Sequence, residues 1–175
     1  VGELGVFAAV ASFVTAGSTI VNALGQAATP RLARHASQNE RAQFLGLVAK
    51  LGALVLGLGL ACVAGAALLG KVVLMLAYRP EYAAYNGLLI AVMGAAIPGY
   101  LAASMGYAVT AARAFDAQVP MFCLVAAICG ATSWLLVPRM GLAGAAVAMA
   151  VAAAAQIGGQ TIILSCALRK LEAAK

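Results

Sequence analysis

Five long stretches of the chain carry no charged residue, and they constrain its fold more than any other feature. They cover residues 4–30, 51–70, 82–112, 117–138 and 140–168. A helix needs about 20 apolar residues to cross a bilayer, so each stretch is long enough to do so. None of them has the alternating pattern of a barrel strand, and each is too long for one. The pattern predicts an all-α, polytopic transmembrane helix bundle with about five spans.

The composition agrees with a membrane protein. Of the 175 residues, 65% are hydrophobic and 9% are charged, whereas charged residues make up about 25% of a soluble domain. The net charge of +6 does not indicate nucleic-acid binding, because the basic residues are scattered between apolar runs instead of forming a patch with aromatic residues. We therefore expect one transmembrane domain over residues 1–175, with the lipid bilayer and no nucleic acid as a partner.

The helix boundaries follow from prolines, glycines and charged residues between the runs. A short helix lying in the far membrane interface, with tyrosines at headgroup depth, is expected between the second and third spans. The predicted spans are 4–29, 44–69, 86–112, 118–137 and 142–168, with the interfacial helix at about 71–80.

The distribution of basic residues predicts an orientation. In an antiparallel bundle, eight of the eleven lie on one side: Arg31, Arg34, Arg41, Lys50, Arg113, Arg169, Lys170 and Lys175. The side richer in lysine and arginine faces the cytoplasm. The C-terminus is expected there and the N-terminus on the periplasmic side. Five helices with an external N-terminus predict that a preceding helix is missing from this chain.

A stripe of polar side chains runs along the first predicted span. Its members recur at helical spacings of three and four, which places them on one face. They are Ser12, Thr15, Thr19, Asn22 and Gln26. Hydrocarbon does not tolerate unpartnered amides, so this stripe should face protein or water. It either lines a polar cavity or bonds to neighbouring helices.

Two further polar groups are candidates for the same cavity. Tyr100, Ser104 and Tyr107 share one face of the third span beyond Pro98, and Gln156 and Gln160 share one face of the fifth. Four basic residues close to the cytoplasmic ends are candidates for binding a diphosphate or another anionic headgroup, since guanidinium groups suit phosphate. They are Arg31, Arg34, Lys50 and Arg113. The alternative is that they set topology and contact anionic lipid.

The sequence offers no set of catalytic or metal-binding residues. It contains no paired carboxylates within a span and no arrangement of serine, histidine and aspartate with plausible reach. The four cysteines fall inside apolar runs, form no CxxC pair and have one histidine, His35, in the whole chain, so a metal site is not expected. We expect no enzyme activity, no catalytic residue, no metal and no cofactor.

Several segments, taken in order, resemble the C-terminal lobe of bacterial polysaccharide flippases. The segments are GVFAA at 5–9, NALGQAA at 22–28, PRLAR at 30–34, YRPEYA at 78–83, YL at 100–101 with AAR at 111–113, and VPRMGLAGAA at 137–146. Arg79 departs from the glycine usual in the fourth of these. These flippases belong to the multidrug/oligosaccharidyl-lipid/polysaccharide exporter superfamily.

The resemblance implies a two-lobe transporter with six helices in each lobe. This chain would supply five helices of the second lobe, and its partners would be the missing N-terminal lobe and a lipid-linked oligosaccharide. The implied function is flipping or export of polysaccharide precursors across the bacterial inner membrane by alternating access, as in lipopolysaccharide biosynthesis. The alternatives are a drug/cation antiporter or peptidoglycan-precursor flippase of the same superfamily, and a structural membrane subunit that transports nothing.

Overall fold

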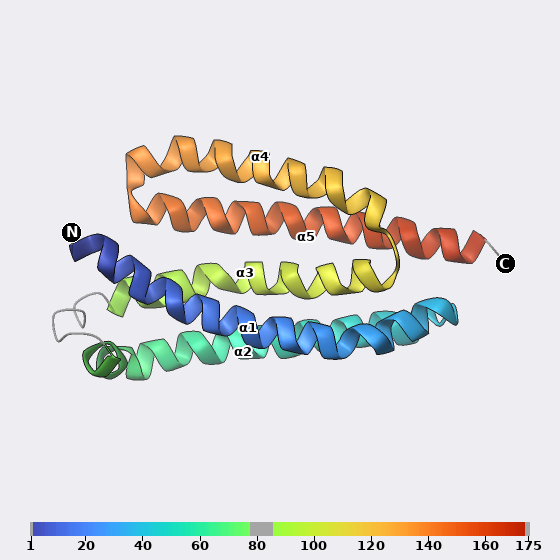
Figure 1. The fold of residues 1–175 in the computed structure, drawn as a ribbon, viewed down its shortest axis with the longest axis horizontal. Helices are drawn as coiled ribbons and strands as arrows, with labels where there is room; N and C mark the ends of the chain where they lie inside the picture. Colours follow the sequence, from blue (N-terminus) through green and yellow to red (C-terminus); the bar gives the residue numbers. More distant parts are fainter. Residues whose placement is uncertain (1, 78–85, 174–175) are drawn as a thin grey trace.

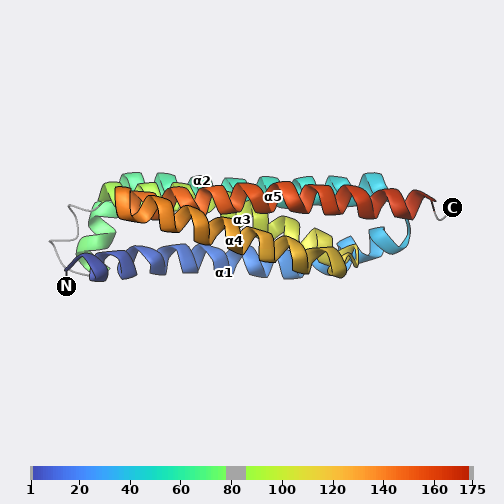
Figure 2. The same cartoon turned by 90° about the horizontal axis from the view of Figure 1, so that it is seen from above.

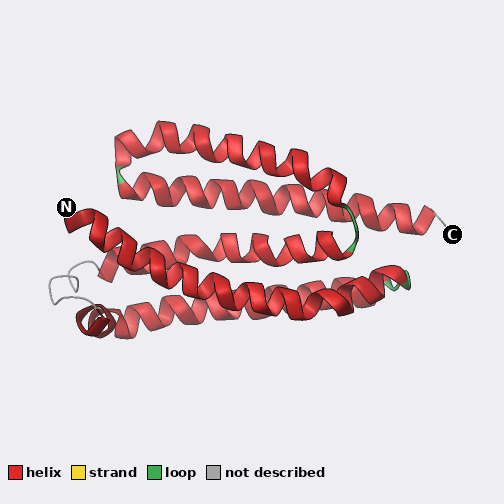
Figure 3. Cartoon of the chain, in the orientation of Figure 1, coloured by secondary structure: helices red, strands yellow, loops and turns green. Residues whose placement is uncertain are grey.

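The computed structural model describes residues 2–77 and 86–173, and these residues form five α-helices (Figure 3). The helices are α1 (Gly2–Ser37), α2 (Arg41–Ala77), α3 (Asn86–Ala111), α4 (Phe115–Met140) and α5 (Leu142–Ala173). No strand occurs among the described residues. The all-α bundle expected from the five apolar runs is confirmed.

The helices run alternately up and down along a common long axis (Figures 1 and 2). The central helix is α3, which packs against α1, α2 and α5, while α4 packs mainly along α5. The end of α1, the start of α2, the end of α3, the start of α4 and the end of α5 lie at one end of the bundle (Figure 1). We call this the basic end, because it carries Arg31, Arg34, Arg41, Arg113 and Arg169.

Apolar side chains from four helices meet inside the basic end. Leu32 of α1 and Phe44 of α2 are fully buried there against Val109 of α3 and Leu164 of α5. Nearer the middle of the bundle, Val21 and Val55 form a second cluster with neighbours from α3. Lipid tails are as apolar as leucine, so such contacts hold membrane helices together through close packing rather than through escape from water.

Two prolines that were expected to end helices lie inside them. Pro30 is within α1, which continues to Ser37, and Pro138 is within α4, which continues to Met140. A proline removes one main-chain hydrogen bond, and the flanking bonds keep the helix intact. The boundaries predicted at residues 29 and 137 are therefore wrong.

The helices end instead at residues in the left-handed region of backbone conformation. Asn39 has φ of 57°, Arg113 has φ of 56° and Gly141 has φ of 59°. Each lies just past a helix, where a left-handed residue lets the next N–H groups turn back to the last carbonyl groups. The Gly141 N–H donates to the Val137 carbonyl oxygen at 2.9 Å, and this residue alone separates α4 from α5. Just beyond it, Gly144 lies against the main chain of Leu136.

The second helix is longer than predicted. It continues through Leu69, its expected end, to Ala77. Its last part turns across the end of the bundle and is seen end-on in Figure 1. Residues 71–77 of the expected interfacial helix are thus helical and continuous with α2. The rest of that segment, and the YRPEYA element, lie outside the described residues.

Four helices are long and apolar enough to cross a membrane. Among the described residues these stretches are Arg41–Val72, Leu89–Ala111, Phe115–Met140 and Gly144–Arg169. The span predicted over 4–29 is not among these four and stays a prediction. The chain is a multi-pass helical membrane protein.

Candidate functional site

The polar stripe of α1 lies on the surface of the bundle. All five of its side chains are exposed: Ser12, Thr15, Thr19, Asn22 and Gln26. The hydroxyl group of Thr19 donates to the Thr15 carbonyl oxygen at 2.9 Å, a bond within the same helix. One described contact joins the stripe to another helix, and it is made by Asn22.

The opposite face of α1 is held against α3 by two tyrosines that fill the space above two glycines. The Tyr100 side chain lies over Gly17, and the Tyr107 ring lies over Gly25. A side chain at either glycine would overlap the tyrosine, so both positions allow a close approach of the two helices. Because this face of α1 packs against α3, the polar stripe on its opposite face points away from the bundle.

Both tyrosines also form hydrogen bonds to α1. The Tyr100 hydroxyl donates to the Val14 carbonyl oxygen at 2.8 Å. The Tyr107 hydroxyl donates to Asn22 Oδ1 at 3.4 Å. The second bond orients an amide of the stripe, so Tyr107 and Asn22 link the predicted cavity residues of α3 to those of α1.

The remaining cavity candidates on α3 and α5 are enclosed by other helices. Tyr100 and Ser104 are buried, with 4% and 3% of their surfaces exposed, and the Ser104 hydroxyl donates to the Leu101 carbonyl oxygen. Gln156 is half-buried and Gln160 is completely buried. Tyr100, Ser104 and Gln160 thus face helix interfaces in this chain, and Tyr107 is the candidate that reaches the exposed stripe.

A small pocket adjoins the stripe. It has a volume of about 220 Å³ and lies where α1, α3 and α5 meet. Asn22 and Ser18 of α1, Tyr100 of α3 and Met149 of α5 contribute to its lining. One amide and two hydroxyl groups in a mainly apolar wall can orient a ligand that has both polar and apolar parts.

A larger pocket lies at the basic end. It has a volume of about 610 Å³ and combines the end of α1 with the end of α3. Its lining consists of Pro30, Ala33, Arg34, Ala36, Ser37, Ala111, Ala112 and Arg113. Two of the four basic candidates, Arg34 and Arg113, are thereby brought to one pocket. Arg31 and Lys50 are exposed and do not line it.

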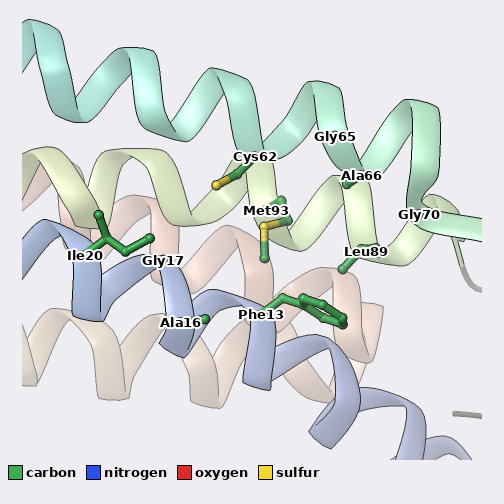
Figure 4. Close-up of a pocket in the computed structure, with 10 residues that line it drawn as sticks. All are labelled: Phe13, Ala16, Gly17, Ile20, Cys62, Gly65, Ala66, Gly70, Leu89 and Met93. Atoms are coloured by element: carbon green, nitrogen blue, oxygen red, sulfur yellow. The ribbon is translucent and has the colours of Figure 1, made fainter. Parts of the chain in front are cut away.

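Sequence reasoning missed an apolar pocket on the other side of α1. It has a volume of about 270 Å³ and is formed by α1, α2 and α3 (Figure 4). Phe13 and Ile20 of α1 face Cys62 of α2 and Met93 of α3 across it. The glycines of α1 and α2 were the available signal, because small residues on facing helices leave such space. The positions of the glycines alone do not show which helices pack together.

The described residues contain no cluster of three or more histidine, cysteine, aspartate or glutamate side chains that could hold a metal ion. Near the basic end, His35 Nδ1 pairs with Glu40 Oε2 at 2.6 Å. No family model matches the chain, and neither a curated protein nor a solved structure matches it significantly. The sequence and the geometry therefore carry the functional argument.

Proposed function

We propose that this chain forms most of one lobe of a transporter that flips lipid-linked oligosaccharides across the bacterial inner membrane by alternating access. The observation that carries the proposal is the outward-facing polar stripe on α1, held in place by Tyr100 and Tyr107 from behind. Together with the resemblance to polysaccharide flippases, it favours transport over a purely structural role.

The physical reason is the cost of moving a sugar through lipid. A sugar headgroup with its diphosphate is large, polar and anionic, so it needs a wet and preferably cationic path, while its lipid tail stays in the bilayer. Hydroxyl and amide groups on α1 supply hydrogen-bonding partners along the length of such a path. In the proposed arrangement this face of α1 meets a second lobe across a central cavity.

The pocket at the basic end fits the anionic part of the substrate. Arg34 and Arg113 come from different helices and line the same pocket. Guanidinium groups bind phosphate oxygens through paired hydrogen bonds, so two of them can hold a diphosphate. We assign them to capture of the diphosphate at the cytoplasmic mouth, with the basic end facing the cytoplasm.

A thiol-accessibility experiment tests the polar path. All native cysteines of the full-length protein, including the four of this chain, are replaced by alanine, and single cysteines are then introduced. Asn22→Cys and Gln26→Cys should react with a membrane-impermeant maleimide, whereas Leu135→Cys, an exposed apolar position on α4, should not. If the α1 positions were as unreactive as the α4 position, water would not reach the stripe and the proposal would fail.

A complementation experiment tests the substrate. The full-length protein is expressed in a strain that lacks its polysaccharide flippase, and surface polysaccharide is measured. Arg34→Ala and Arg113→Ala should each reduce export at equal protein levels, and Arg139→Ala, near the other end of the bundle, should not. Export of a cationic drug without restored polysaccharide would favour the antiporter instead.

A further inference from the structure

The apolar pocket between α1, α2 and α3 reaches from the surface of the bundle to its interior (Figure 4). At its α1 wall, Ala16 is exposed and Ile20 has 49% of its surface exposed. At its inner wall, Ala66 of α2 and Met93 of α3 are buried, with 8% and 5% of their surfaces exposed. The pocket is therefore open on the side of Ala16 and Ile20 and closed by α2 and α3.

The side chains that line the pocket offer very little for hydrogen bonding. The thiol of Cys62 and the thioether of Met93 are weakly polar, and the other lining residues are alanine, glycine, isoleucine, leucine and phenylalanine. A buried water molecule needs two to four polar partners, and this lining does not supply them. The chemistry of the wall calls for an apolar occupant.

The position of the pocket supplies such an occupant. Its α2 wall lies within Arg41–Val72 and its α3 wall lies within Leu89–Ala111, two stretches that are long and apolar enough to cross a membrane. Beside the pocket on α2, Leu69 has 59% of its surface exposed. Large exposed apolar side chains on a membrane-spanning helix suit contact with lipid tails. The opening of the pocket thus lies where hydrocarbon chains surround the bundle.

The size of the pocket fits part of a hydrocarbon chain. Its volume is about 270 Å³, whereas a cavity of about 150 Å³ with a similar apolar lining already holds a benzene molecule. An unfilled space of this kind leaves its lining without dispersion contacts on one side. A flexible chain that enters from the surface restores these contacts.

We propose that the hydrocarbon chain of a bilayer lipid inserts into this pocket. The chain enters beside Ala16 and Ile20 and packs between Phe13 on one wall and Cys62 and Met93 on the other (Figure 4). The inference rests on the chain being a membrane protein and is independent of what it transports.

Photo-cross-linking tests this proposal in the full-length protein. The protein is placed in nanodiscs of phosphatidylcholine that carries a diazirine near the end of one acyl chain, irradiated, and mapped by mass spectrometry. Met93, which is buried, should be labelled as strongly as Leu124, which is exposed on α4, whereas the fully buried Val55 should stay unlabelled. If Met93 were as unlabelled as Val55, no lipid chain would enter the pocket and the proposal would be overturned.

Two glycines of α2 provide a matched pair of variants. A Cβ atom at Gly65 or at Gly57 would meet nothing within 4 Å, but of the two only Gly65 lines the pocket. Gly65→Leu should fill the pocket and abolish the labelling of Met93, and Gly57→Leu should leave it unchanged. Undiminished labelling of Met93 in Gly65→Leu would mean that the lipid reaches this residue by another route, and this result would contradict the proposal.

Discussion

Helices α1 and α4 each have one face on the surface of the bundle, but α1 exposes polar side chains there and α4 exposes apolar ones. The exposed face of α1 carries hydroxyl and amide groups from Ser12 to Gln26. Between its ends, α4 exposes large apolar side chains, among them Phe122, Leu124 and Trp134, and Met121 is its buried residue. Residues that are exposed in the isolated chain can therefore meet different surroundings in the membrane.

The difference follows from what each surface can meet in a membrane. Acyl chains accept phenylalanine, leucine and tryptophan side chains but leave amides without partners. The face of α4 suits lipid, and the face of α1 suits water or polar groups of another protein segment. The comparison gives three predictions, which start with the largest expected effect.

Introducing a charged side chain should give the largest difference in folded yield between the face of α4 and the face of α1. Leu124→Arg places a guanidinium group on the lipid-exposed face of α4, where an arginine near the middle of a span costs about 3 kcal/mol in membrane insertion. Thr19→Arg places the same group on the stripe of α1 and should be tolerated. The folded yield is measured by size-exclusion chromatography of a fluorescent fusion. Similar losses for the two variants would mean that both faces meet lipid.

A methyl group on the inner face of α1 should have the next largest effect. Gly25→Ala would force the Tyr107 ring away, and Gly17→Ala would do the same to Tyr100. Overpacking of this kind costs about 1–3 kcal/mol. On α4, Gly130→Ala meets nothing within 4 Å and serves as the matched control. Thermal unfolding in detergent should show lower midpoints for the α1 variants alone, and an equal drop for Gly130→Ala would contradict the close contact between α1 and α3.

Removing the tyrosine hydroxyl groups should have the smallest effect on the free energy of unfolding. Tyr100→Phe removes a 2.8 Å hydrogen bond to the Val14 carbonyl oxygen, which is worth about 1 kcal/mol. Tyr107→Phe removes a 3.4 Å bond to Asn22 and should cost less, because the bond is longer and its acceptor is exposed. Both rings still cover their glycines. The same unfolding assay measures the order, and a larger loss for Tyr107→Phe would show that its bond to the stripe is stronger than its length indicates.

The sequence was sufficient for the all-helical fold class, because uninterrupted apolar runs of this length have few alternatives. It was less reliable for helix ends. Pro30 and Pro138 were given too much weight, since a helix can lose one hydrogen bond and continue, whereas Asn39 and Gly141 mark the actual ends through their left-handed conformations. Asparagine and glycine are the usual residues at such positions, so this signal was present and went unused.

The candidate site was partly predictable for a similar reason. Helical spacing placed the α1 stripe on one face, and the structure brings Arg34 and Arg113 to one pocket. Spacing could not show that Tyr100 and Ser104 would be enclosed by neighbours. That depends on which helices pack together, and here Gly17 and Gly25 decide it by admitting tyrosines from α3. Pairs of this kind are far apart in the sequence and have no local pattern.

The single residue between α4 and α5 limits how the bundle can rearrange. With Gly141 as the whole connection and Gly144 seated on the backbone of Leu136, the two helices cannot swing apart at that end. In any conformational change, α4 and α5 must either move as a pair or separate at the other end of the bundle, where residues 112–114 link α4 to α3. Helix α4 therefore moves together with α5 at this end, so a displacement of either helix also displaces the other.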